Sequence, residues 1–239
     1  MYLTRFYSFA RPQVCALWRP SMLVVLVLLT ACSAPIMPTR QRAAEPTPSN
    51  LPAELTYDFG TEPIELDPLY ASNRASLDLV TQLFDGLTYL DPETSQPQPA
   101  LAEEWDVSAD GRTYTFRLRS GVTWINQSGE PQGELTAADM VYAIRRACRP
   151  DTITPTRVLL FIIEQCERVS GVDGIPDLES VGVRAVERYI LEFQLNAPAA
   201  YFPAILALPV AFPVPAAILE QQGAAWSEWP TIFTNGPFR

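Results

Sequence analysis

Apolar residues between positions 77 and 87 recur at intervals of three and four, which places them on one face of a helix. They are Leu77, Val80, Leu83, Phe84 and Leu87. The Asp85-Gly86 pair breaks the pattern, so we expect the helix to stop there. Upstream, Asp67-Pro68 predicts a bend, and Leu55–Phe59 has the composition of a first strand.

Strand-like alternation follows in residues 104–118. Asp110-Gly111 suits the positive φ angles of a tight hairpin turn. After this turn, Tyr114, Phe116 and Leu118 alternate with polar side chains, so the strand should have one buried and one solvated face. The same alternation predicts a second hairpin in Val181–Leu195.

The segment between the two hairpins contains signals for a loop and for a helix. Residues 125–134 (INQSGEPQGE) are polar and contain two glycines, so we expect an exposed loop. Thr136 and Asp139 form a capping-box-like helix start, with aspartate in place of the usual glutamate. Three arginines near the end of that helix favour its partly negative C-terminus, and we interpret them as a solvated cap, with an anion site as the alternative: Arg145, Arg146 and Arg149.

Later stretches predict further elements. We expect an apolar core run between residues 158 and 163, a helix in Ala199–Leu208 and a short helix in Ala216–Gly223. Asn235-Gly236 predicts a structural turn.

Charge and residue types exclude several classes of function. The 239 residues contain 27 acids, 17 arginines, no lysine and no histidine, for a net charge of −10. An acidic surface repels phosphate backbones, so no nucleic-acid partner is expected. Without histidine, Ser-His-Asp, Cys-His and HExxH sites are excluded. A carboxylate hydrolase is the remaining enzyme alternative, but pairs such as Glu103 with Glu104 look surface-like; we expect no enzyme, no cofactor and no metal.

The N-terminus predicts export. Three arginines precede the apolar run Met22–Ala31, whose ten residues make about 15 Å of helix, half of what a bilayer core requires. Residues 1–32 are therefore interpreted as a signal peptide. The run ends in Leu-Thr-Ala-Cys, similar to the lipobox of bacterial lipoproteins, so Cys32 is the predicted lipidation site; an ordinary secretory cleavage site is the alternative. Residues 33–52 are proline-rich and predict a disordered tether.

Cys148 and Cys166 are the two cysteines that remain after the signal. In an exported protein such a pair favours a disulfide, with two buried free thiols as the alternative. Closing this loop of about 17 residues would stabilise the fold by roughly 3 kcal/mol.

Several segments, in one order, resemble a known family. LDP, LFDGL, PALAEEW, DGRTYTFRLRSGVTW, LTAADMVYAIRRA, YILEFQL, AYFPAILALP and TNGPFR occur between residues 66 and 239. Together they resemble the solute-binding proteins of oligopeptide and dipeptide ABC importers, extracellular family 5. The resemblance implies a mixed α/β, two-lobed fold of the periplasmic-binding-protein type II kind. Residues 53–239 would form most of the N-terminal lobe and the small β-rich domain, with the second lobe missing and weak binding by this chain alone.

The resemblance also implies ligand-binding candidates. In the family, the loop that corresponds to Ser72, Asn73 and Arg74 lies at the entrance between the lobes and touches ligand, partly through its backbone. Helix capping is the alternative role for Ser72 and Asn73. Thr156 falls in a stretch beside the cleft, and Trp124 is either a ligand platform or a core residue.

The resemblance implies that the protein binds a solute and does not catalyse a reaction on it. The chain would be a monomeric lipoprotein, anchored to the outer face of the cell membrane, that takes up peptides and passes them to ABC permease subunits. Two lobes would close over the ligand by hinge motion. Alternatives on the same scaffold are binders of nickel, haem or sugar and a sensory or structural surface lipoprotein.

Overall fold

A computed structural model describes residues 58, 60–171, 175–228 and 230–237. The predicted signal peptide, Cys32, the tether and nearly all of the predicted strand Leu55–Phe59 lie outside these residues. Among the residues described, no helix has the length and hydropathy needed to cross a bilayer.

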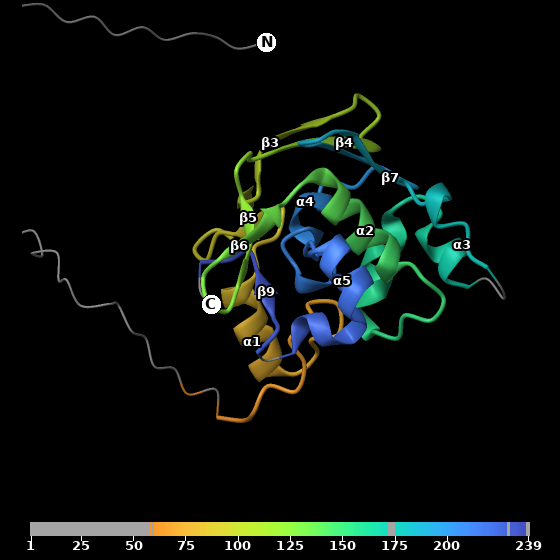
Figure 1. Cartoon of the computed structure of the whole chain (residues 1–239). Coiled ribbons are helices and arrows are strands. Elements are labelled where there is room, and N and C mark those ends of the chain that lie inside the picture. Colours follow the sequence, from red (N-terminus) through yellow and green to blue (C-terminus); the bar gives the residue numbers. More distant parts are fainter. Residues whose placement is uncertain (1–57, 59, 172–174, 229, 238–239) are drawn as a thin grey trace, which may run out of the picture. The chain divides into compact units, whose positions relative to one another are not determined.

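A four-stranded antiparallel sheet forms one layer of the described part, with strand order β3-β4-β8-β7 (Figure 1). The strands are β3 (Ala102–Val107), β4 (Thr113–Leu118), β7 (Val183–Glu187) and β8 (Ile190–Gln194). The two predicted hairpins are thus confirmed, and they pair side by side through β4 and β8, where Phe116 lies opposite Leu191. Gly111 has a φ of 69° in the first turn, a conformation that suits glycine.

The sheet is buried on one face only. Tyr114, Phe116 and Phe193 point into the core, and the rings of Phe116 and Phe193 meet edge to face at 5.8 Å. Phe202 covers them from the helix α4 (Phe202–Ile205), 5.1 Å from the ring of Phe193. The alternation read from the sequence therefore predicts correctly which side chains form the core.

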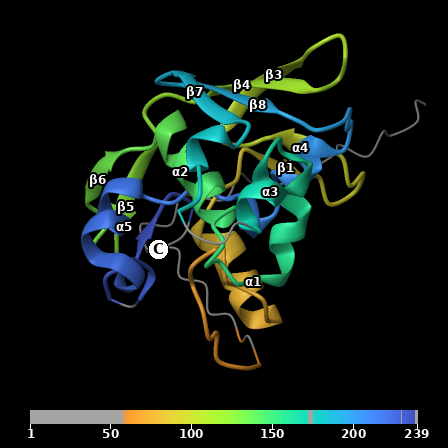
Figure 2. The same ribbon diagram turned by 90° about the vertical axis from the view of Figure 1, so that its right-hand side faces the viewer.

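Helices pack beneath the sheet (Figure 2). The longest are α1 (Arg74–Leu83) and α2 (Ala137–Ala147), and α2 packs against β7 and β8. The shorter helical segments are η1 (Pro155–Ile162), α3 (Cys166–Ser170), η2 (Leu178–Ser180), η3 (Pro209–Ala211), α5 (Ala216–Gln222) and η4 (Gly223–Ser227).

Two small sheets complete the described part. One is the hairpin of β1 (Thr88–Leu90) and β2 (Pro97–Pro99); the other has the order β6-β5-β9. Its members are β5 (Thr123–Asn126), β6 (Pro131–Glu134) and β9 (Phe233–Thr234).

Two of the expected elements need correction. The stretch 125–134 is not a loop but most of the β5–β6 hairpin, because β5 also pairs with β9 from the far end of the chain. The predicted helix Ala199–Leu208 is a single turn, α4, followed by a 3₁₀ turn that begins at Pro209. The end of the first helix is as predicted: its last residue is Leu83 and its C-cap is Phe84, directly before the Asp85-Gly86 pair.

Two other expectations are met in part or in full. Helix α5 lies where a short helix was predicted. The apolar run after Thr156 is split: Leu160 and Ile163 are buried, whereas Val158 and Leu159 are exposed.

Candidate functional site

The loop before α1 is held by local hydrogen bonds. The Asn73 side chain accepts a 2.8 Å hydrogen bond from the Ser76 N–H and caps the helix. Ser76 Oγ in turn accepts the N–H groups of Ile64 and Glu65, each at 3.1 Å. Arg74 forms an ion pair with Asp78 one turn along α1, at 2.6 Å.

These contacts bear on the candidate loop. Asn73 acts as a helix cap, the alternative that the sequence left open, whereas Ser72 and Arg74 are exposed on the surface.

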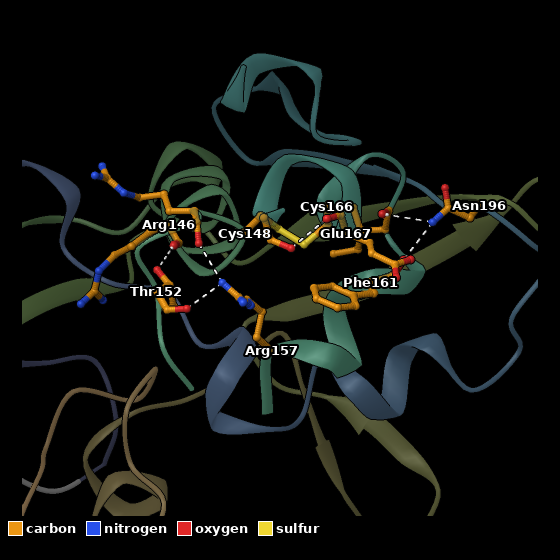
Figure 3. Close-up of a disulfide and its surroundings, with 11 residues drawn as sticks. Arg146, Cys148, Thr152, Arg157, Phe161, Cys166, Glu167 and Asn196 are labelled. Carbon is orange, nitrogen blue, oxygen red and sulfur yellow. Dashed lines mark hydrogen bonds between the residues drawn. A yellow bond between two sulfur atoms is a disulfide. The ribbon is translucent and has the colours of Figure 1, made fainter. Parts of the chain in front are cut away.

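Thr156 lies in the first turn of η1, in the segment that leads away from α2. Thr152 Oγ1 donates to the Arg146 carbonyl at 2.7 Å, and the Arg157 guanidinium donates to the carbonyls of Arg149 and Thr152 at 2.9 and 2.6 Å (Figure 3). Thr156 Oγ1 is 3.1 Å from Thr154 Oγ1. The backbone of this segment is therefore fixed to the end of α2, while Ile153, Val158 and Leu159 expose apolar side chains beside Thr156.

Arg146 connects the two candidate segments. Its guanidinium pairs with both carboxylate oxygens of Asp67 and lies over the Tyr70 ring, 5.3 Å from the centroid. Its carbonyl holds Thr152. Burial alone would lower the pKa of Arg146, but the hydrogen bonds and charge of Asp67 outweigh it and raise the pKa. The loop that leads to Ser72 and the segment that leads to Thr156 thus meet at one residue.

The Asp67 carboxylate is the centre of this buried cluster. It also accepts the Leu69 N–H at 3.0 Å and the Trp226 Nε1–H at 3.2 Å. The interpretation of Arg146 as part of a solvated cap is therefore wrong, since its side chain is only 14% exposed. Local patterns cannot predict this pairing, because Asp67 and Arg146 are 79 positions apart.

A cavity of about 360 Å³ adjoins the cluster. Tyr70 and Arg146 line it together with residues 63–67 and three residues near η4: Ala224, Ser227 and Glu228. It borders the bend that leads to the Ser72–Arg74 loop, but none of the three residues of that loop lines it.

The disulfide between Cys148 and Cys166 joins the end of α2 to the start of α3 (Figure 3). Both cysteines are fully buried, and their Cα atoms are 5.1 Å apart. The bond closes the loop that contains Thr156. Asn196 fastens the far side of this loop by donating to the Phe161 carbonyl at 2.8 Å.

Trp124 lies apart from these segments, on β5. Its side chain is 3% exposed, which is the burial of a core residue and argues against a ligand platform. Its Nε1 makes no hydrogen bond of ordinary geometry in the described part of the chain. It does lie close enough to Asp139 to influence that carboxyl weakly, although burial is the dominant effect and raises the pKa of Asp139.

Asp139 itself has a structural role that the sequence predicted. Its carboxylate accepts the Thr136 N–H at 2.9 Å, as in a capping box, and it also accepts the Ala216 N–H at 3.2 Å. One acid therefore fixes the starts of both α2 and α5.

In the described ranges, no three histidine, cysteine, aspartate or glutamate side chains gather as metal ligands. Thr156 contributes a hydroxyl, and its sequence neighbours Val158 and Leu159 expose apolar side chains.

Comparisons with known proteins agree with this fold. A family model described as "Bacterial extracellular solute-binding proteins, family 5 Middle" matches residues 96–239. The probable deoxycholate-binding periplasmic protein YgiS of Escherichia coli is 35% identical over 82% of this chain and 36% of its own length. The dipeptide-binding protein DppE of Bacillus subtilis is 34% identical over 74% of this chain and 31% of its own length.

Solved structures give the same result. The crystal structure of Haemophilus influenzae OppA in complex with the peptide RPPGFSPFR has a TM-score of 0.66 and 29% identity, over 75% of this chain and 34% of that one. The chain spans about a third of the length of the curated relatives it matches. The mixed α/β fold is that of periplasmic peptide-binding proteins, and the chain belongs to the bacterial extracellular solute-binding proteins of family 5.

Proposed function

We propose that this chain belongs to a substrate-binding lipoprotein of an ABC importer, which captures peptides outside the cell membrane and delivers them to the permease. The observation that carries the proposal is the family match over residues 96–239, together with relatives named for dipeptide and oligopeptide binding. The peptide complex of Haemophilus influenzae OppA, which shares this fold, supports the same ligand class.

The proposed contacts come from the two segments that meet at Arg146. Ser72, Asn73 and Arg74 would offer mainly backbone groups to a peptide, because the Asn73 side chain is engaged in capping α1. Thr156 would offer a hydroxyl beside the exposed apolar side chains of Val158 and Leu159. Backbone-directed recognition tolerates varied side chains, as a peptide importer requires.

Membrane attachment is part of the proposal. A diacylglycerol on Cys32, with the tether of residues 33–52, would hold the folded part outside the membrane within reach of the permease. The protein would act as a monomer, and ligand closure rather than bond chemistry would signal loading.

A second candidate ligand has one specific observation in its favour. The relative with 35% identity is named for probable deoxycholate binding, and it is matched over more of this chain than DppE. The same scaffold would then carry a bile acid instead of a peptide.

Transport in the native host tests both ligands. The gene is deleted, and uptake of radiolabelled tri-alanine and of radiolabelled deoxycholate is measured. We expect tri-alanine uptake to fall and deoxycholate uptake to stay unchanged, with recovery when the wild-type gene is restored. A Cys32→Ala gene should restore uptake poorly and should incorporate no labelled palmitate. Unchanged peptide uptake in the deletion strain contradicts the proposal, and a selective loss of deoxycholate uptake favours the second ligand.

A further inference from the structure

A second cavity shares Arg146 with the smaller one but is otherwise lined by different residues. Its volume is about 610 Å³, and the residues that line it come from α2 and the turn after it, η2, β7 and the first residue of α5. This volume falls in the range of roughly 300–1,000 Å³ that small-molecule sites occupy. Neither Ser72, Asn73, Arg74 nor Thr156 lines it.

Arginines dominate the polar part of the lining. A chain with more acids than bases brings four of its arginines to this one cavity: Arg145, Arg146, Arg149 and Arg184. Each of them pairs with a carboxylate, and these carboxylates differ in how deeply they are buried. Asp67 is buried with Arg146 and belongs to the fixed cluster at the bend, whereas Asp151 and Glu179, the partners of Arg149 and Arg145, are mostly exposed.

Arg145 has one donor without a partner among the described residues, while its other nitrogens contact Glu179 and, at 3.5 Å, the Val183 carbonyl. Its side chain is 20% exposed, yet its Nε is buried and donates no hydrogen bond to any residue that the structure describes. Its main partner is Glu179 at 2.5 Å, and the Glu179 side chain is 82% exposed. An ion pair with one freely exposed partner contributes little, so replacing that carboxylate costs little. An incoming anion can therefore take the place of Glu179 on a largely desolvated guanidinium.

The other walls of the cavity are apolar. Val141 on α2, Leu178 on η2 and Ala185 on β7 line it, and Ala138 and Ala216 extend the same surface. A bare inorganic anion would leave this apolar surface in water. A ligand that has an apolar body next to its charge would cover it, which is favourable in proportion to the area removed from water.

We propose that this cavity binds an amphipathic anion, with a carboxylate or phosphate monoester head on Arg145 and Arg149 and an apolar chain along Val141 and Leu178. Apart from Arg146, which also lines the smaller cavity, the residues of this site are not those of the proposed peptide site, and the proposal does not depend on the peptide function. Carboxylate and phosphate heads share the same bidentate chemistry with arginine.

Calorimetric titration of the full chain tests the proposal. The protein carries Cys32→Ser, so that no acyl anchor is attached. The probes are dodecanoate and monododecyl phosphate, used below their micelle concentrations, with dodecanol and inorganic phosphate as controls for chain and head alone. We expect saturable binding of at least one of the two amphiphilic anions, weakened by added salt, and far weaker binding of dodecanol and of inorganic phosphate.

Three variants separate the site from general effects. Arg145→Gln should weaken binding by about tenfold or more, because a desolvated charged hydrogen bond is lost. Glu179→Ala should tighten binding by about two- to fivefold, because the competing carboxylate is gone. This gain cannot result from misfolding. Arg117→Gln removes an exposed ion pair on β4, outside the cavity, and should leave affinity unchanged.

Four results would overturn the proposal. They are the absence of dodecanoate and monododecyl phosphate binding to the wild type, equal affinity for dodecanol, unchanged affinity in both Arg145→Gln and Glu179→Ala, and displacement of the bound anion by excess tri-alanine. The last result would place the amphiphile in the proposed peptide site instead.

Discussion

Arg146 on α2 pairs with Asp67 in the bend before α1, and both side chains are largely removed from water. Trp226, 159 positions after Asp67, donates its indole N–H to the same carboxylate. One acid therefore joins three segments that are distant in the sequence, and the loop that carries Ser72, Asn73 and Arg74 begins only a few residues beyond it.

Removing one partner of this pair should be strongly destabilising. Asp67→Ala leaves the Arg146 guanidinium buried without a counter-charge, and we expect the free energy of unfolding to fall by about 3–5 kcal/mol. Urea denaturation followed by tryptophan fluorescence measures it. The matched control is Arg117→Gln, which removes an exposed pair with Glu104 and should cost far less, because exposed ion pairs contribute little to stability. Equal losses in the two variants would show that the buried pair has no special role.

The disulfide should stabilise the loop that contains Thr156. Cys148 and Cys166 are 18 positions apart, and replacing both with alanine should lower the free energy of unfolding by about 3 kcal/mol. Dithiothreitol should lower the melting temperature of the wild type to nearly that of the variant, and should leave the variant unaffected. If dithiothreitol, added before the protein is heated through its unfolding transition, left the wild-type melting temperature unchanged, the bond would be absent.

Gly236 is required by a close approach of two backbones. Its N–H donates to the Leu83 carbonyl at 2.9 Å, and a Cβ at this position would lie 2.7 Å from Leu83 C and 2.8 Å from Phe84 N. We expect Gly236→Ala to cost about 1–3 kcal/mol, because neither backbone segment can yield without moving the end of α1. Gly171→Ala is the control, since its Cβ would meet nothing closer than 3.8 Å. Chemical denaturation measures the stability of both variants. Equal stability of Gly236→Ala and Gly171→Ala would contradict this account.

Glu134 should make stability depend on pH in the acidic range. The Tyr189 hydroxyl, the Gly121 N–H and Arg188 hold the pKa of this carboxyl at about 2, against an ordinary value of 4.5. Because the pKa is lower in the folded state, the stabilisation is complete above pH 4.5 and is lost as pH falls towards 2.

Melting temperatures between pH 7 and 2 test this prediction. The wild type should lose more stability than Glu134→Gln between pH 4.5 and 2, while Glu93→Gln, an exposed acid in the β1–β2 turn, should follow the wild type. Parallel curves for the wild type and Glu134→Gln would refute the role assigned to Glu134.

The residues show what local patterns predict and what they miss. The alternation of Tyr114, Phe116 and Leu118 predicted a core strand, because period-two burial is a local property. The Thr136–Asp139 cap was found for the same reason. Residues 125–134 look like a loop from sequence because β6 is polar and exposed, and because β9, which also pairs with β5, lies about a hundred positions later.

The candidate site also contains both residues whose role is predictable from local sequence and residues whose role is not. Asn73 is recognisable as a helix cap from its neighbours in the sequence. The sequence does not distinguish Arg146 from the other two arginines at the end of the same helix. Only the fold distinguishes it, because it places Asp67 and Tyr70 against that guanidinium.

The central claim is that the protein captures peptides, and the ligand that it carries from the cell tests this most directly. The tagged gene product is purified from its native host without added ligand and denatured, and the released small molecules are identified by mass spectrometry. We expect a mixture of short peptides in near-stoichiometric amount with the protein. Release of deoxycholate or another non-peptide solute, with no peptide above the background of a tag-only control, would contradict the account.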